Sequence, residues 1–280
     1  MRLALVVLAL AAAGACGPHR SFPDDGRVHV VAAFGPLFEA VTRVGGDRVT
    51  AVNLTPAGAE PHDVELASDD VDRVEDADVV VYLGGGFQPA VAEVAERTSG
   101  RAVDVVGPDA AGDPHVWLDP VRFVGVIDAI RDALVAADPM GAGAYRSNAA
   151  TYVDEARAVD AAYATGLRTC RQREIISAHD AFGLLGARYG LDVRAIAGRS
   201  PEIEPDPERL AHLADEAKET GVRTIFTEAL VAPDIAETLA KEAGVTTAVL
   251  DPVEGFRHGD TYATVMRKNL TVLRDALGCT

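Results

Sequence analysis

The sequence predicts an α/β fold with parallel sheets in two halves that one long helix connects. In each half, short apolar runs alternate with stretches in which apolar residues recur at helical spacing. This βαβ alternation is typical of parallel sheets covered by helices on both faces. Between the halves, residues 146–169 carry no strand pattern and no proline. These two features predict how the chain is arranged and leave its function open.

The first half contains four apolar runs that we interpret as strands. These predicted strands are residues 28–34, 48–55, 78–84 and 101–107. Helices are predicted between them at residues 36–46 and 88–98. The run "LGGGF" (83–87) follows a strand, but it lacks the spacing of a dinucleotide fingerprint and has no Lys-Ser/Thr pair. We therefore interpret it as a strand-to-helix turn and not as a phosphate loop.

The second half repeats the alternation. Its predicted strands are residues 173–179, 191–198, 222–228 and 245–251, and its predicted helices are residues 180–190, 206–221, 234–244 and a C-terminal segment through Leu277. The helix at 206–221 has an N-cap in Asp206, a proline in its first turn and a terminating Gly221. Caps of this kind mark where a helix begins and ends.

The linking segment 146–169 is predicted to form one helix. Tyr152, Ala156, Val159 and Tyr163 lie at helical spacing along it. About twenty helical residues span roughly 30 Å, which is long enough to run between two lobes. A helix of that length makes a stiffer connection than a pair of extended strands.

The composition indicates a globular and strongly acidic chain. Its 280 residues carry 43 acidic and 26 basic side chains, for a net charge of −17, and 48% of the residues are hydrophobic. This charge disfavours nucleic acid and anionic lipid headgroups as partners. It is compatible with a cation as cargo, although an acidic surface alone equally suits an ordinary soluble protein.

The amino terminus resembles a bacterial export signal with a lipidation site. Arg2 precedes an apolar stretch, residues 3–13, which is too short to cross a bilayer as a helix. Small residues then lead to Cys16, as in a lipobox, with Ala13 where leucine is more usual. We expect Cys16 to be the lipidated first residue of the mature protein, anchored to the membrane, and residues 17–27 to form a tether; ordinary cleavage with an unmodified Cys16 is the alternative.

Two further cysteines, Cys170 and Cys279, remain once Cys16 is set aside. An exported protein meets an oxidising environment, in which disulfides persist. We therefore expect a bond between these two residues, with two separate thiols as the alternative.

Three of the seven histidines lie just beyond a predicted strand or in the loop after one. They are His62, His115 and His179, and Asp251 ends a predicted strand in the same manner. Ligands of open α/β sheets bind beyond the carboxyl ends of the strands. Three imidazoles and one carboxylate from separate segments can complete the tetrahedral shell of Zn²⁺. The sequence thus predicts a metal site made of these four residues.

The other four histidines lack this context and are interpreted as structural or surface residues: His19, His29, His212 and His258. Two acidic residues remain as reserve carboxylates. Glu60 lies two residues before His62, and Glu228 ends the predicted strand at 222–228. Either could support the site from outside the ligand set or join it as a ligand.

Five segments together resemble the zinc/manganese ABC-transporter substrate-binding lipoproteins, the cluster A-I metal receptors. They are "PAGAEPHDVELASDDV", "DPHVWLDP", "SAHDAFGLLGARYGL", "SPEIEPDPERLAHLADEAKETGVRTIFTEAL" and "AETLAKEAGVTTAVLDPVEG". They follow the family's order and cover most of residues 28–275. The resemblance implies two (β/α) lobes joined by a single long helix, with the metal in the cleft between them.

The resemblance also assigns His62 and His115 to the first lobe and His179 and Asp251 to the second. The predicted boundaries are 1–16 for the signal peptide and lipobox, 17–27 for the tether, 28–145 and 170–280 for the lobes, and 146–169 for the linking helix. One departure stands out, because residues 107–115 hold no extra histidine, whereas many zinc receptors of the family carry a His-rich loop there.

The function implied is that of a monomeric, non-enzymatic receptor outside the cytoplasmic membrane, which binds Zn²⁺ and delivers it to an ABC permease. Manganese is the alternative cargo. The third ligand varies between histidine and glutamate in the family, and His179 favours zinc because imidazole suits zinc and manganese prefers oxygen. Two other classes are a secreted zinc hydrolase and a surface adhesin. A coordinating Asp251 would close the shell against a catalytic water, and no His-Glu-x-x-His helix is present in the sequence.

Overall fold

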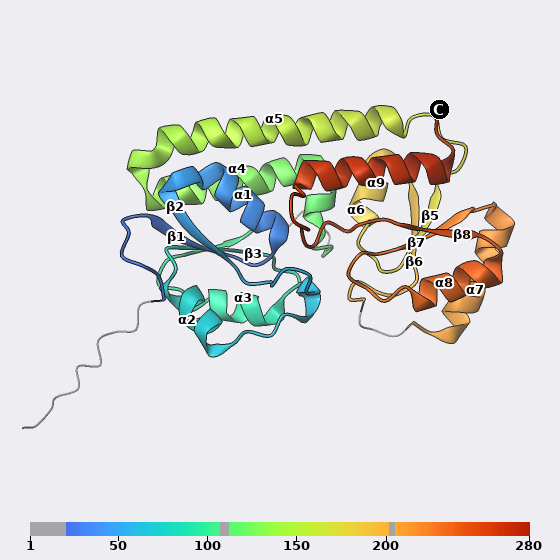
Figure 1. Cartoon of the computed structure of the whole chain (residues 1–280), viewed down its shortest axis with the longest axis horizontal. Coiled ribbons are helices and arrows are strands. Elements are labelled where there is room, and N and C mark those ends of the chain that lie inside the picture. The colour runs from blue at the N-terminus through green and yellow to red at the C-terminus, as the bar shows by residue number, and fades with distance from the viewer. Residues whose placement is uncertain (1–20, 107–111, 202–204) are drawn as a thin grey trace, which may run out of the picture.

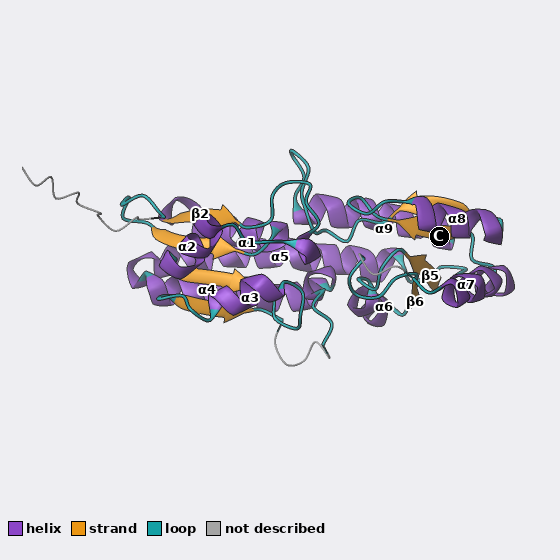
Figure 2. Cartoon of the chain, turned by 90° about the horizontal axis from the view of Figure 1, so that it is seen from below, coloured by secondary structure: helices purple, strands orange, loops and turns teal. Residues whose placement is uncertain are grey.

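A computed structural model describes residues 21–106, 112–201 and 205–280. The predicted signal peptide, with the expected lipidation site Cys16, and the beginning of the tether lie outside these residues. The described chain forms two α/β lobes side by side, each built on a four-stranded parallel sheet (Figure 1). This confirms the predicted fold class. Figure 2 shows the two sheets from below, one in each lobe.

The N-terminal lobe contains a sheet in the order β2-β1-β3-β4. Its strands are β1 (Val28–Ala32), β2 (Val49–Asn53), β3 (Val79–Tyr82) and β4 (Arg101–Asp104), and its helices are α1 (Gly35–Gly45), α2 (Ser68–Asp76), α3 (Pro89–Ala95) and α4 (Pro120–Ala137). The first three residues of β3 are fully buried valines, as expected for a central strand covered on both faces. In Figure 1, α1 and α4 lie on one side of the sheet and α2 and α3 on the other.

The C-terminal lobe repeats this arrangement, with the sheet order β6-β5-β7-β8. Its strands are β5 (Glu174–Ser177), β6 (Asp192–Ala195), β7 (Thr224–Thr227) and β8 (Thr246–Val249), and its helices are α6 (Gly183–Tyr189), α7 (Pro207–Thr220), α8 (Asp234–Ala243) and α9 (Tyr262–Leu277). The predicted caps of α7 are present, because Asp206 accepts from the backbone N–H of Glu208 and Gly221 has φ +75°.

Two helices were not predicted, α2 and α4. The longer of them, α4, begins at the Asp119-Pro120 pair, where the Asp119 carboxylate accepts a hydrogen bond from Val121 N at 2.9 Å. An aspartate N-cap followed by proline at the first helical position is a common start of a helix. Because α4 follows directly on the segment of His115, its N-cap also fixes where that segment ends.

The long helix is α5 (Ala142–Gly166), which begins and ends slightly earlier than the predicted 146–169. It packs on α4 and α1 of the N-terminal lobe and extends over the C-terminal lobe, where α9 lies beside it (Figure 1). The hydroxyl of Tyr163 on α5 donates to the carbonyl of Met266 on α9 at 2.7 Å. The first residue of α9, Tyr262, also bonds Glu39 and Trp117 of the N-terminal lobe. Both α5 and α9 therefore contact the two lobes.

The predicted disulfide is confirmed, since Cys170 and Cys279 are bonded. The two residues also form an isolated antiparallel bridge. The bond joins the end of the chain to the segment that follows α5, and it closes a sequence separation of 109 residues. Cross-links over long loops restrict the unfolded chain most strongly.

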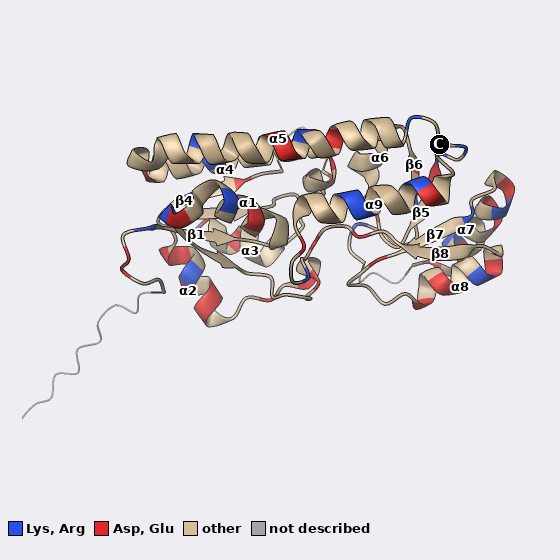
Figure 3. Ribbon diagram, turned by 45° about the horizontal axis from the view of Figure 1, so that its top comes forward, with Lys and Arg blue, Asp and Glu red and all other residues tan. Residues whose placement is uncertain are grey.

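Acidic side chains lie on α2, α7 and α8, on the outer faces of both lobes (Figure 3). In the part of the chain that the structure describes, no helix combines the length and apolar composition needed to cross a membrane.

Candidate metal centre

Three of the predicted ligands meet a glutamate between the lobes. His62, His115, His179 and Glu254 each present one donor atom, and all four atoms lie within 4.8 Å of one another. The three imidazole rings have centroid separations of 5.4–5.6 Å. Within the described residues, this is the group of histidine, cysteine and carboxylate side chains close enough to hold a metal ion.

His62 lies in a short 3₁₀ turn, Pro61–Asp63, in the loop after β2. The carboxylate of Glu60 accepts from the backbone N–H of His62 at 3.2 Å and caps this turn. The ring of Phe87 packs edge-on against the imidazole, with centroids 4.3 Å apart. These contacts fix the direction of the side chain without using its Nε2 atom.

His115 lies between β4 and α4 and is fully buried. The carboxylate of Asp113 accepts from the backbone N–H of His115 at 3.0 Å, and the same oxygen lies 2.8 Å from the ring Nδ1. An Nδ1–H that donates to a carboxylate places the free lone pair on Nε2. The Nε2 atom of His115 therefore faces the centre of the cluster with its lone pair free.

His179 follows β5 and is held by the same device. Glu228, just beyond β7, accepts from the backbone N–H of His179 at 2.9 Å, and its second oxygen lies 2.5 Å from Nδ1. Glu228 therefore orients His179 and is not itself a member of the four-residue cluster. Although burial opposes a charge on the imidazole, Glu228 and Glu254 raise the pKa of His179 to about 10.

Glu254 provides the oxygen of the cluster. Its Oε1 lies 3.6 Å from His62 Nε2, 3.9 Å from His115 Nε2 and 3.5 Å from His179 Nε2. Burial opposes ionisation of this fully buried carboxyl, but its contacts with His179 and His62 lower the pKa of Glu254 to about 2. The carboxylate is therefore negatively charged where the three nitrogens converge.

The four residues of the cluster share one chemical property. The Nε2 atoms of the three histidines and both carboxylate oxygens of Glu254 are buried without a hydrogen-bond partner. Buried polar atoms are nearly always paired, so each exception needs an explanation. A cation at the centre would accept all of these lone pairs at once. Three nitrogens and one oxygen form a donor set that suits tetrahedral zinc.

Glu254, and not the predicted Asp251, completes the cluster. The carboxylate of Asp251 turns back into its own loop and accepts from the backbone N–H of Val253 at 2.7 Å. The backbone of Asp251 is paired with the side-chain amide of Asn269, at 3.0 and 2.6 Å. Asp251 thus builds the turn that leads to Glu254, and it is absent from the four-residue cluster. Val253 in this turn has φ +59°, an unusual conformation for a β-branched residue.

The remaining candidates lie elsewhere. Glu60 is outside the cluster, and burial together with the charge of Glu254 raises the pKa of Glu60 to about 8. His29 stacks on Phe22, with ring centroids 4.7 Å apart, while His212 and His258 are exposed. His19 lies outside the described residues.

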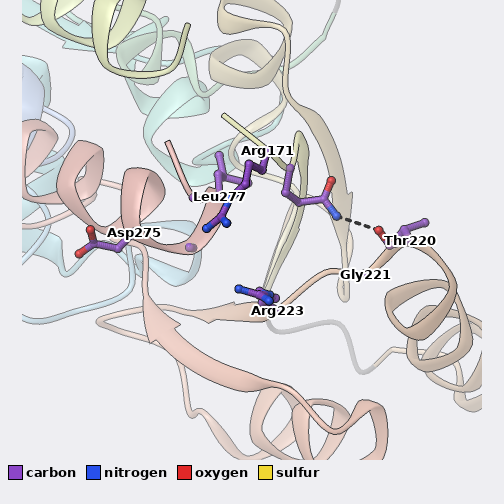
Figure 4. A pocket seen from close by; sticks show the side chains of 9 residues that line it. Arg171, Thr220, Gly221, Arg223, Asp275 and Leu277 are labelled. Carbon is purple, nitrogen blue, oxygen red and sulfur yellow. Dashed lines mark hydrogen bonds between the residues drawn. The ribbon is translucent and has the colours of Figure 1, made fainter. Parts of the chain in front are cut away.

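A cavity of about 270 Å³ lies away from the metal cluster, at the far end of the C-terminal lobe (Figure 4). Arg171 and Arg223 face it, next to the carboxyl ends of α7 and α9. The side chain of Gln172 donates to the carbonyl of Thr220 there, and the backbone N–H groups of Arg171 and Gln172 donate to that of Leu277. Cations beside helix carboxyl ends stabilise the helices, so this cavity has a structural explanation.

The sequence is similar to those of known zinc-binding proteins. A family model described as "Zinc-uptake complex component A periplasmic" (ZnuA) matches residues 30–276. The chain is 34% identical to the zinc-binding protein AdcA of Streptococcus pyogenes serotype M1, over 89% of this chain and 56% of that protein. It therefore spans about half the length of the AdcA relatives. It is 31% identical to the high-affinity zinc uptake system protein ZnuA of Bacillus subtilis, over 98% of this chain and 96% of that protein.

Solved structures give the same result. The Zn(II)-bound ZnuA-like domain of Streptococcus pneumoniae AdcA is 35% identical and superposes with a TM-score of 0.78, over 90% of this chain and 99% of that domain. The laminin-binding protein of Streptococcus agalactiae, described as an adhesin with metal-transporting activity, is 30% identical, with a TM-score of 0.83 over 89% and 99% of the two chains.

Proposed function

The chain belongs to the family of periplasmic zinc-uptake component A proteins, and from this premise we propose that it is an extracytoplasmic receptor that binds Zn²⁺ and delivers it to an ABC permease. The proposed ligands are His62, His115, His179 and Glu254. The observation that carries the proposal is the convergence of their unpaired, buried donor atoms within 4.8 Å. Capture of a dilute cation requires a preorganised site of this kind.

The donor set supports zinc as the cargo over manganese. Imidazole nitrogen suits zinc, whereas manganese prefers carboxylate and carbonyl oxygens. Manganese is also the weakest binder among the divalent first-row ions. We expect zinc to bind at least about 100-fold more tightly than manganese, a difference of about 2.7 kcal/mol.

A competition titration on the chelator-stripped full chain tests this proposal. Zinc should displace a fluorescent or coloured chelator stoichiometrically, and excess manganese should not release the bound zinc. Equal affinities for the two ions would contradict the zinc assignment, and failure of the wild-type chain to bind either ion would contradict a receptor function.

A receptor is favoured over a zinc hydrolase by the same donor set. A catalytic zinc keeps one coordination position for water and needs a general base beside it. Four protein donors complete a tetrahedral shell and leave no position for a catalytic water. We therefore expect no hydrolysis of ester or peptide substrates by the zinc-loaded protein.

We also propose that Cys16 carries a lipid anchor, which keeps the receptor, a monomer, beside its permease at the outer face of the cytoplasmic membrane. The support is the run of small residues before Cys16. Two or more acyl chains are enough for stable attachment. Cys16→Ser should release the protein from the membrane fraction. Unchanged retention, with no acyl mass on the native N-terminus, would contradict the anchor.

A further inference from the structure

We infer that Trp117 is a positioning residue for Glu254 and holds the fourth ligand against the N-terminal lobe, an inference that rests on the proposed function. Trp117 lies two residues after His115, in the 3₁₀ turn Val116–Leu118, and is only 1% exposed. Its indole N–H donates to the carbonyl of Pro252 at 2.7 Å. The bond joins a segment of the N-terminal lobe to the loop that carries Glu254.

The indole is itself fixed from several sides. Its ring packs against His115, Phe34 and Phe87, with centroids 5.1, 4.7 and 5.2 Å away. The hydroxyl of Tyr262 donates to the backbone carbonyl of Trp117 at 2.9 Å. A donor held this firmly determines the position of its acceptor, because tryptophan offers one N–H in a fixed direction.

Trp117 bonds a turn, residues 251–254, which we call the 251–254 turn. Asn269 fixes the first residue of the turn through two bonds to the backbone of Asp251. At the far end, the backbone of Glu254 and Gly255 lies against Gly35 in the N-terminal lobe, so closely that a Cβ on Gly35 would stand 3.4 Å from both. Trp117 acts between these two anchors, at Pro252.

The turn therefore associates Glu254 with His62 and His115, although Glu254 follows β8 of the C-terminal lobe in the chain. His179 differs, because both hydrogen bonds that orient it come from Glu228 of its own lobe. Without the indole N–H, the carbonyl of Pro252 would be buried and unpaired, and the turn would shift toward water. A carboxylate that shifts can bind metal through both oxygens or admit a water molecule, which raises the coordination number.

The test compares Trp117→Phe with Tyr163→Phe in the full chain. Each variant removes one aromatic donor from a buried backbone carbonyl at 2.7 Å, but Tyr163 bonds Met266 on α9 and is not in the metal cluster. We expect Trp117→Phe to weaken zinc binding about tenfold. We also expect Co²⁺, used as a probe, to lose the strong visible absorption of a tetrahedral site. Tyr163→Phe should lower the unfolding temperature and leave both metal measurements unchanged.

A double-mutant cycle with Glu254→Gln shows whether Trp117 acts through the carboxylate. In the Glu254→Gln background, Trp117→Phe should cause little further loss of zinc affinity. If Trp117→Phe does not fold, Asn269→Leu releases the first residue of the same turn, and the same two metal measurements apply to it.

The outcomes separate the inference from the proposed function. Wild-type affinity and an unchanged cobalt spectrum in Trp117→Phe, or in Asn269→Leu where that variant replaces it, would overturn the positioning role and leave the receptor proposal intact. If the wild-type chain binds no zinc, the proposed function fails and the inference fails with it.

Discussion

The assignment of the oxygen ligand can be tested by exchanging one carboxylate for its amide at each of two positions. Glu254→Gln keeps the shape of the side chain but removes the charge that faces the three Nε2 atoms at 3.5–3.9 Å. Asp251→Asn keeps an oxygen that can accept from Val253 N, which is the contact of Asp251 in the turn. The two variants are therefore matched in chemistry and differ only in the role of the carboxylate.

The expected magnitudes differ strongly. Loss of an outer support of a metal ligand typically costs 10- to 100-fold in affinity, so loss of the charged ligand itself should cost more than about 100-fold. Asp251→Asn should change zinc affinity by less than about threefold, because Asn can still accept from Val253 N and Asp251 lies outside the cluster. The metal-free Glu254→Gln protein should be less stable than wild type, because the lowered pKa of Glu254 means that its charge stabilises the metal-free fold. The zinc-induced change is therefore compared within each variant.

Thermal unfolding with and without zinc measures these effects together. At a zinc concentration of about 100 times the wild-type Kd, binding stabilises the wild type by about 2.7 kcal/mol, which raises Tm by roughly 5–11 °C. A variant with a 100-fold weaker Kd gains only about 0.4 kcal/mol, or roughly 1–2 °C. A wild-type shift in Glu254→Gln, combined with a lost shift in Asp251→Asn, would refute the assignment and restore Asp251 as the ligand.

Three further predictions follow from other parts of the structure. His179→Ala should abolish tight zinc binding, whereas His212→Ala on the exposed face of α7 should bind like wild type; equal affinities in a chelator competition would exclude His179 as a ligand. Asp113→Ala should weaken zinc binding about 10- to 100-fold, because Asp113 orients His115 through Nδ1; an unchanged affinity would show that the ring is oriented without it. The double variant Cys170→Ser, Cys279→Ser should lose up to about 4.8 kcal/mol of unfolding free energy for a loop of this length, measured by denaturant titration; an unchanged midpoint, or thiol labelling of the unreduced wild type, would argue against the bond.

Much of the fold could be predicted from the sequence. Each strand in the described part of the chain falls inside a predicted run. The central strands β1, β3, β5 and β7 are largely buried and apolar, as strands covered on both faces are. The edge strands β4 and β8 are mostly exposed. The helix α4 is not predicted from the sequence pattern. The residues that mark its start, Asp119 and Pro120, also belong to the segment of His115. The ends of α5 differ from the prediction by a few residues, as helix ends often do.

The convergence of the three histidines could be predicted because each lies just beyond a strand or in the loop after one, and such loops meet at one edge of a parallel sheet. The fourth ligand could not be found in that way. Asp251 lies closer to the end of β8, and only the turn beyond it carries Glu254 to the centre. That turn depends on Val253 at φ +59° and on a bond from Trp117, 135 residues away in sequence. The local sequence pattern shows neither this backbone angle nor this long-range hydrogen bond.

The two sheets have the same strand order, in which β2 corresponds to β6, β1 to β5, β3 to β7 and β4 to β8. His115 and Glu254 follow the corresponding strands β4 and β8, so they occupy matching places in the two lobes. His62 and His179 follow β2 and β5, which do not correspond. The repeated scaffold is thus symmetric, while the metal centre that it carries is not. All four residues of the cluster lie in loops and none lies in a strand, so the donor set can change without a change in either sheet.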